Sequence, residues 1–458
     1  MVRQQLYGSS EVSLFAFLGG MVMKMKETGA ILKKLTAFSV PLILSGLLQQ
    51  LFNWVDALIV GNVLGETALA AVGATSSVYG LFITLLVGFT SGLSVLFAQQ
   101  YGEGNHAANA RLLAFFAGVL AVVFAGVAAL GIAFTGTLLE KMDTPEQLFS
   151  GAQAYLRIIF LGVPFLALYN TYSAALRGMG NSRVPFVAVL ISSVTNGVLD
   201  VAFVAFFGFG ISGAAAATVL AQIAMTAYVV IYTLLRYPRL RPASGKKERG
   251  AGIWSRGMKF GTPPAVQSSI SSFGNLFLQK FMNGFGEQTV AAITTAYRVD
   301  SVLFLPLINF STAIATLVAQ ETGAGNKEEA RRILKFGSML MLILSVILTA
   351  VIVVTGKSLL SMFGLTAESV QIGEDFFRAI AVYYFIFGLS MSFRGYLEGT
   401  GDLVYSGIMG ILGLGVRLLC SYCFEGLWGN MVIAYAEVFS WVFLLGAFVW
   451  RYLRRHRD

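Results

Sequence analysis

Charged residues are scarce in this chain. They make up 12% of the 458 residues, whereas a soluble domain typically carries about 25%. The hydrophobic fraction is 56%, so most of the surface must face something other than water. The net charge of +9 is spread unevenly, which argues against a nucleic-acid-binding surface and indicates membrane topology signals. The composition therefore predicts a membrane protein that spans the bilayer many times.

Cysteines and nucleotide-binding motifs are also nearly absent. Cys420 and Cys423 form a CxxC in an apolar run without a second Cys or His pair nearby. We interpret them as small apolar side chains in a helix rather than a redox or zinc motif. Residues 208–213 match GxGxxG without a preceding strand, and residues 356–358 lack the upstream glycine of a phosphate-binding loop. We therefore expect that the protein is not an enzyme, needs no cofactor and does not use ATP. The energy for its activity is then expected to come from an ion gradient.

The chain repeats itself at one fixed offset, at which position 98 aligns with position 319. AQQYGEGN at residues 98–105 thus aligns with AQETGAGN at 319–326, with five of eight positions identical. The same repeat offset aligns two further pairs, GETALAA with GEQTVAA (65–71 and 286–292) and LRGMGN with LEGTGD (176–181 and 397–402). Tandem halves in an apolar chain are typical of secondary transporters, in which substrate binds between the halves.

Windows of about 20 apolar residues predict twelve membrane spans. We expect all of them to be helices, because a lipid-exposed strand could not satisfy its backbone outside a closed barrel. The expected spans are residues 37–60, 68–97, 110–135, 151–176, 184–207, 212–235, 258–282, 289–318, 332–355, 373–396, 403–425 and 431–452.

The distribution of lysine and arginine predicts the orientation. These residues cluster at both termini, between the two halves and in the even-numbered loops, whereas the odd-numbered loops offer only Lys141 and Lys357. Positively charged loops stay in the cytoplasm, so both termini and the central segment are expected there. The fold is then an all-α membrane protein with two six-helix lobes, related by a pseudo-twofold axis along the membrane normal. The expected domains are an N-terminal tail at 1–27 (disordered, or a wrongly assigned extension), an N-lobe at 28–236, a cytoplasmic linker at 237–252 and a C-lobe at 253–458.

Polar side chains interrupt four apolar spans of the first half. An ionised side chain at the bilayer centre costs about 2.5–3.5 kcal/mol, so we expect such residues to have a functional role. Asp56 shares one face of the first span with other polar residues, and Asp200 lies four residues after an asparagine in the fifth. The polar residues accompanying them are Gln49, Asn53, Asn170, Asn196, Thr218, Gln222 and Thr226. Interhelical hydrogen bonding explains Gln222 and Thr226 as well as a site role does. It does not explain two aspartates, because asparagine would form such hydrogen bonds equally well.

Asp56 and Asp200 are therefore candidates for the coupling site, and we expect Gln49 of the first span to belong to it as well. Burial disfavours a charged carboxylate, and a second carboxylate nearby disfavours it further, so such a pair binds a proton near neutral pH. Completed by amide and hydroxyl oxygens, the pair could instead bind Na⁺, because small hard cations prefer oxygen ligands. Either ion could drive transport.

The second half departs from this pattern. At the repeat offset, Asp200 aligns with Ser421 and Asn196 with Arg417. The seventh span carries an uncharged stripe in place of an acid, which we expect to line the substrate cavity. The expected cavity residues are Gln267, Ser271, Asn275, Gln279 and, from the first span, Asn53. Arg298 and Asp300 lie on nearly opposite faces of their helix, so each is expected to have another partner, most simply in a structural ion pair.

These residues resemble the multidrug and toxic compound extrusion (MATE) transporters, in particular their DinF-like branch. The motifs are the segment around PLILSGLLQQLFNWVDALIVGN from Pro41, the two AQxxGxGN copies, and LRGMGN followed by NGVLD at residues 196–200. The resemblance covers about residues 28–452 and implies export of cationic or amphipathic compounds in exchange for Na⁺ or H⁺. It also implies a bend of the first helix at Pro41. Some relatives carry acids in the seventh and tenth spans, and the seventh span here has none. The implied cation site of the first lobe is Asp56, Asn170, Asn196, Asp200 and Thr218.

Two alternatives stay open. A flippase for lipid-linked saccharides could use the same scaffold, although its cavity would be cationic, and only Arg298 and Arg417 are available here. A channel or membrane scaffold is disfavoured by the paired carboxylates and the two-lobe organisation. The prediction is a monomeric multi-pass antiporter of a prokaryotic inner membrane, whose partners are small organic cations or amphipathic drugs and the lipid bilayer, with no nucleic acid.

Overall fold

A computed structural model describes residues 5–240 and 250–455, and side-chain environments for residues 28–240 and 252–455. All regular secondary structure in these ranges is helical. The first half contains α1 (Gln5–Leu64), α2 (Glu66–Gly102), α3 (His106–Ala133), α4 (Thr135–Lys141), α5 (Glu146–Gly178), α6 (Arg183–Asp200), η1 (Val201–Phe206), α7 (Gly210–Arg236) and η2 (Pro238–Leu240). The second half contains α8 (Gly250–Met282), η3 (Asn283–Phe285), α9 (Glu287–Gly323), α10 (Lys327–Ser361), α11 (Ala367–Ala381), α12 (Tyr384–Gly399), α13 (Leu403–Trp428), η4 (Gly429–Met431) and α14 (Val432–Arg454).

Each of the twelve expected spans coincides with one of these helices or with two consecutive ones, and the boundaries differ by a few residues. By length and composition alone, 9 helices of the described chain could cross a membrane, or up to 10 if α11 and α12, bent by 51°, form one span. One of the 9, Leu403–Arg454, contains both α13 and α14, which pack against each other. The remaining expected span is α8, a continuous 33-residue helix that contains Pro263 and Pro264. With α13 and α14 counted separately and α8 included, the helices agree with twelve spans.

The repeat in the sequence is a repeat in space. α2 and α9 are both 37 residues long, and each begins after a glycine, Gly65 or Gly286, with φ of 85° or 87°. A side chain is strained at such positive φ, so glycine suits both turns. The two glycines are equivalent positions of the repeat, and each copy therefore starts its second span with the same turn.

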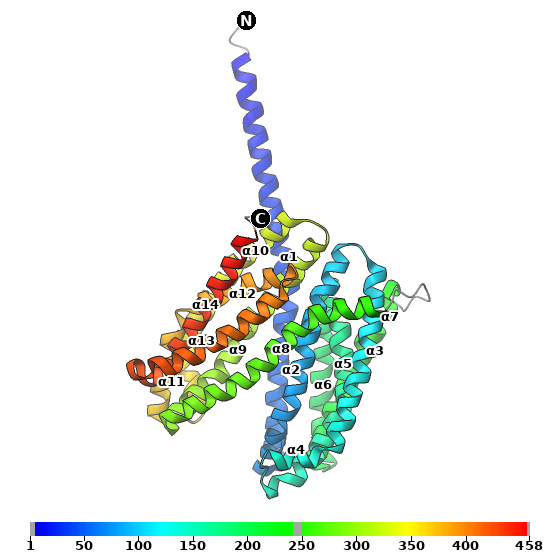
Figure 1. Ribbon diagram of the computed structural model, residues 1–458, viewed down its shortest axis with the longest axis vertical. Coiled ribbons are helices and arrows are strands. Elements are labelled where there is room, and N and C mark those ends of the chain that lie inside the picture. The colour runs from blue at the N-terminus through cyan, green and yellow to red at the C-terminus, as the bar shows by residue number, and fades with distance from the viewer. Residues whose placement is uncertain (1–4, 241–249, 456–458) are drawn as a thin grey trace.

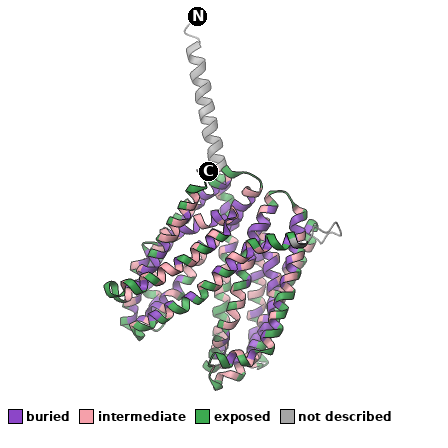
Figure 2. Cartoon of the chain, in the orientation of Figure 1, coloured by how far each residue is buried: buried purple, intermediate pink, exposed green. Residues whose placement is uncertain are grey.

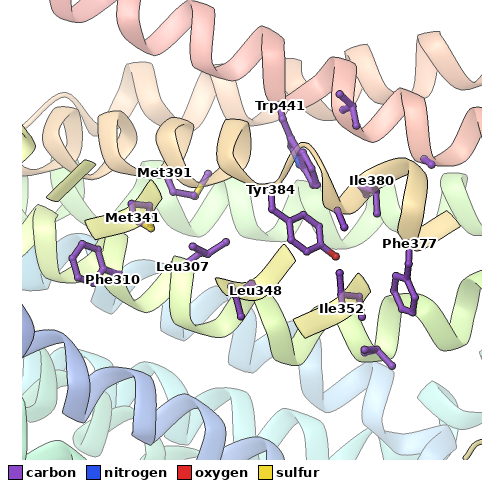
Figure 3. Close-up of a cluster of buried hydrophobic side chains, with 14 of the residues drawn as sticks. Leu307, Phe310, Met341, Leu348, Ile352, Phe377, Ile380, Tyr384, Met391 and Trp441 are labelled. Atoms are coloured by element: carbon purple, nitrogen blue, oxygen red, sulfur yellow. The ribbon is translucent and has the colours of Figure 1, made fainter. Parts of the chain in front are cut away.

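Each lobe has its own apolar core. One buried cluster, which includes Leu156 and Phe160, lies in the first lobe. Another lies in the second lobe, where Figure 3 shows Tyr384, Trp441 and their neighbours packed between helices. Buried residues concentrate inside each lobe and exposed residues on the outside of the helices (Figure 2). This distribution suits helices whose outer apolar faces contact lipid.

The two lobes diverge from the end of the molecule where the C-terminus lies (Figure 1). At this joined end, α2 packs against α8 and α9, and α1 packs against α9. Ile31 and Leu35 of α1 are buried in the core cluster of the second lobe. Glycines allow the helices to approach, since a Cβ at Gly92 would collide with the backbone at Phe260. Within the described chain, α1 and α2 thus make most of the contacts between the lobes.

Candidate functional site

A cavity of about 640 Å³ lies inside the first lobe, between α1, α2, α5, α6 and α7. α1 contributes Gln49, Asn53 and Asp56, which line one wall because their spacing puts them on one face of the helix. Asn170 of α5 and Thr218 of α7 line other walls. Polar residues predicted from several different spans therefore meet around one cavity.

Asp200 lies directly behind this cavity and is fully buried. It is the last residue of α6, and the chain continues from it into the π-helical turn η1. Its carboxyl group lies close enough to that of Asp56 for the two to interact electrostatically. One turn earlier, Asn196 Nδ2 donates to Thr218 Oγ1 at 3.2 Å. Short π-helical segments occur frequently at functional sites, and this one follows the buried acid.

Within the described residues, no lysine or arginine neutralises the two aspartates. Neither forms a salt bridge within the described chain, and both Asp200 carboxylate oxygens and Asp56 Oδ1 lack a hydrogen-bond partner there. An unpaired buried carboxylate is strongly unfavourable. A bound proton would allow one carboxyl group to donate to the other, and Na⁺ would be coordinated by both. The two carboxyl groups are thus chemically suited to take up a proton or a small cation, and the amide of Asn170 and the hydroxyl of Thr218 line the same cavity as Asp56.

Three tyrosines at this cavity were missed by sequence reasoning. Tyr79 of α2 and Tyr155 and Tyr169 of α5 line it. Gln222 Nε2 donates to the Tyr79 hydroxyl at 3.1 Å, and Thr226 Oγ1 donates to the Phe165 carbonyl at 2.9 Å. Gln222 and Thr226 therefore link helices, as the alternative interpretation held. Tyrosines in an apolar span give no periodic polar signal, so only the packing identifies them.

In the second lobe, Arg417 and Glu437 form a buried ion pair. Arg417, which aligns with Asn196, donates through Nη2 to Glu437 Oε2 at 2.8 Å and to the Tyr297 hydroxyl at 2.6 Å. Asp300 Oδ1 accepts a 2.5 Å hydrogen bond from Tyr384 Oη. The expectation of an ion pair for Asp300 is wrong, because a tyrosine hydroxyl is its partner.

Arg298, the other residue expected in an ion pair, lies apart from this network. It is exposed, lines a pocket of about 470 Å³ beside η3, and forms no salt bridge in the described chain. The expected ion pair of Arg298 is therefore also missing.

The uncharged stripe of α8 is spread over several environments. Gln267 is buried and accepts from Arg394 Nη2 of α12 at 2.9 Å, within its own lobe. Gln279 Nε2 donates to Asn283 Oδ1 at 3.0 Å, Ser271 is half-buried and Asn275 is exposed. None of the four lines the 640 Å³ cavity, whereas Asn53 does.

Pro41, the expected hinge, lies inside the continuous helix α1. Its carbonyl accepts from Ser45 Oγ at 2.8 Å. Proline cannot donate a backbone hydrogen bond, so α1 lacks one i→i−4 bond at this point.

Comparison with known proteins agrees with the repeat and the fold. One family model, MatE, matches the chain twice, at residues 41–202 and 263–423. The probable multidrug resistance protein YpnP of Bacillus subtilis is 29% identical over 378 residues, which are 82% of this chain and 84% of that protein. The probable multidrug resistance protein NorM of Thermotoga maritima is 26% identical over 387 residues, 82% of each chain.

Solved structures share the architecture. The crystal structure of the Vibrio cholerae MATE transporter VcmN in the bent form aligns with a TM-score of 0.88, covering 94% of this chain and 98% of that one. Sequence identity is 19%, so this likeness concerns the fold. Because the MatE model matches more than half of the sequence, in two copies, the chain belongs to the MATE family, whose members are membrane transporters and not enzymes.

Proposed function

We propose that this protein is a secondary antiporter that exports cationic or amphipathic compounds in exchange for H⁺ or Na⁺. The observation that carries the proposal is the pair formed by half-buried Asp56, which lines the cavity, and fully buried Asp200 behind it, with no neutralising lysine or arginine in the described chain. Relatives named as multidrug resistance proteins support the class of substrate. We assign Asn170, Asn196 and Thr218 as additional ligands of the ion.

Gln49 fits the ion site less directly. It lines the same cavity but lies two helical turns from Asp56, about 10 Å along α1. We therefore place Gln49 on the path of the ion rather than in its coordination shell.

The coupling would follow from charge repulsion. Binding of H⁺ or Na⁺ removes repulsion between Asp56 and Asp200, so that α1, α5, α6 and α7 can close on one another. Drug binding would favour the open arrangement. An ion shifts this equilibrium only by its differential affinity for the two states, and the drug is affected reciprocally. We propose Pro41 as the point at which α1 bends between them.

The joined end would face the cytoplasm. Lysine and arginine concentrate in the segments connected to that end, which indicates the cytoplasmic side. The diverging ends of the lobes would then face outward across a prokaryotic inner membrane. We further propose that substrate binds between the lobes, near Asn53 on one side and Ser271, Asn275 and Gln279 on the other.

A lipid-linked saccharide flippase is the second candidate on this scaffold. It would need a cationic cavity for pyrophosphate, but Arg417 is already neutralised by Glu437. Arg298 is the remaining cation of the two, and a single arginine is a weak basis for a diphosphate site. The paired acids of the first lobe thus favour antiport of cations.

Transport into proteoliposomes with separately imposed H⁺ and Na⁺ gradients tests the proposal. Drug uptake should depend on one of the two gradients and should vanish when it is collapsed. Uptake that is indifferent to both gradients would reject antiport.

A further inference from the structure

The two copies of the AQxxGxGN motif meet the two copies of the LxGxG motif across the lobes. Gln99 Nε2 of α2 donates to the Gly399 carbonyl of α12 at 2.9 Å. Gln320 Nε2 of α9 donates to the Gly178 carbonyl of α5 at 2.8 Å. The two donors are equivalent positions of the repeat, and so are the two acceptors. Each repeat therefore supplies one donor and one acceptor, and both bonds connect the first lobe to the second.

Glycines make this reciprocal contact possible. A Cβ at Gly102 would collide with the carbonyl oxygen of Gln320, and one at Gly323 would collide with that of Gln99. Gly102 and Gly323 are again equivalent positions of the repeat. The backbones of α2 and α9 thus contact each other beside the two glutamine hydrogen bonds.

Both acceptors are carbonyls that a helix leaves unpaired. Gly178 and Gly399 are the last residues of α5 and α12, and terminal carbonyls have no partner within their helix. The glutamine side chain satisfies such a carbonyl while the lobes are together. When they separate at this end, water can take its place, so the bond can break without disturbing either helix.

From this geometry we infer that Gln99 and Gln320, with Gly102 and Gly323, form a symmetric latch that holds the joined end of the transporter closed. Alternating access requires the lobes to separate here, and both bonds must then break together. The salt bridge between Lys34 and Glu321, 3.0 Å long, also crosses the lobes. It contributes less because the Lys34 side chain is 48% exposed.

The latch does not depend on which ion is coupled or which drug is carried. The latch predicts the distance between the lobes in the absence of drug, whereas the proposed function predicts ion and drug binding. Either one can therefore be rejected while the other stands.

The test uses spin labels on both lobes. Ala107 and Glu328 are exposed first-turn residues of α3 and α10, and they too are equivalent positions of the repeat. They would be changed to cysteine in a Cys420→Ser, Cys423→Ser background and the full chain placed in lipid nanodiscs. Pulsed electron–electron double resonance would then give the distribution of distances between the labels.

Gln99→Met and Gln320→Met remove the donor while keeping the size of the side chain. Each should increase the ratio of long to short distances by about two- to tenfold, the equivalent of one net hydrogen bond. The double variant should increase it by roughly the product of the two effects. Gln100→Met is the matched control, because the Gln100 amide donates to Glu103 within its own lobe at 2.8 Å.

A second pair of variants tests the contact without touching the glutamines. Gly323→Ala should also increase the population of long distances, because its Cβ has no room while the lobes are together. Gly118→Ala is its control, since a Cβ there meets nothing within 4 Å. If a methionine variant fails to fold, as judged by thermal unfolding, the glycine pair still decides. Distance distributions that match the controls in folded variants would overturn the latch.

Discussion

The two lobes have the same fold, but their buried charged side chains differ in the partners that the protein provides. In the first, Asp56 and Asp200 face each other with no cation beside them in the described chain. In the second, the position equivalent to Asn196 holds Arg417, which is bonded to Glu437 and Tyr297. Asp300 is bonded to Tyr384. The described first lobe thus holds two neighbouring acids without a counter-ion, whereas the second holds one buried ion pair, Arg417–Glu437, and one acid, Asp300, that is bonded to a tyrosine.

This difference indicates that the two copies of the repeat have different roles. A carboxylate with a permanent arginine partner has little to gain from an exchangeable ion, because its charge is already balanced. Unpaired carboxylates in a low-dielectric site must take up a cation from outside the protein. We therefore expect ion coupling in the first lobe and a structural role for the buried charges of the second.

The largest effect is expected from the acids of the first lobe. Asp200→Asn and Asp56→Asn should each abolish coupled efflux while leaving expression intact, because the amide is nearly isosteric but cannot carry the exchangeable charge. Drug resistance of a sensitised host and uptake into proteoliposomes would measure this. Asp300→Asn, in the second lobe, is the control and should retain ion-dependent efflux. Resistance conferred by the double Asp56→Asn, Asp200→Asn variant would show that the site is wrongly assigned.

The next largest effect should be on stability and should come from the second lobe. Glu437→Gln leaves the Arg417 guanidinium without its counter-charge and should destabilise the protein by about 3–5 kcal/mol. Replacing both partners, as in Arg417→Met with Glu437→Met, should restore most of this loss. Thermal unfolding in detergent provides the comparison. If the double replacement is as unstable as the single one, the pair does more than balance charge.

Pro41→Ala should have a smaller and more selective effect. Restoring a backbone donor stiffens α1 at the proposed hinge, so ion binding should survive while its influence on drug affinity weakens. Drug titrations at low and high pH, with and without Na⁺, measure the coupling factor. The same factor in mutant and wild type would remove Pro41 from the mechanism.

The smallest effects are expected at the uncharged polar positions. Asn53→Leu and Asn275→Leu should change drug preference by a few-fold, because each removes one hydrogen-bonding group worth about 0.5–1.5 kcal/mol. Asn53 lies in the cavity with Asp56, so its replacement should also alter ion dependence, whereas that of Asn275 should not. Resistance profiles over several drugs give the comparison. Equal loss for every drug would indicate a structural role.

Much of this architecture follows from local sequence. Hydropathy predicts the twelve spans, and the fixed offset predicts two equivalent halves. Helical spacing placed Asp56 and Asn53 on one face, and the structure brings Asn170 and Thr218 to the same cavity. These features depend on helix period and composition, which a single sequence contains.

Contacts between helices could not be predicted in the same way. Gln267 belongs to a regular polar stripe, yet it is bonded to Arg394 of α12, a partner fixed by packing. Gln99 and Gln320 stand in visible repeats, but their bonds to Gly399 and Gly178 depend on how the lobes dock. Sequence spacing determines a helix face, and the fold determines what that face meets.

Drug affinity measured against pH and Na⁺ concentration tests the division between lobes most directly. The comparison needs three proteins: the wild type, Asp200→Asn, and the Arg417→Met, Glu437→Met variant. Lower pH or added Na⁺ should weaken drug binding in the wild type, because the ion at Asp56 and Asp200 favours the closed arrangement. This dependence should vanish in Asp200→Asn and persist in the second-lobe variant. Dependence that survives Asp200→Asn but is lost in the second-lobe variant would place the coupling ion in the other lobe and contradict the account.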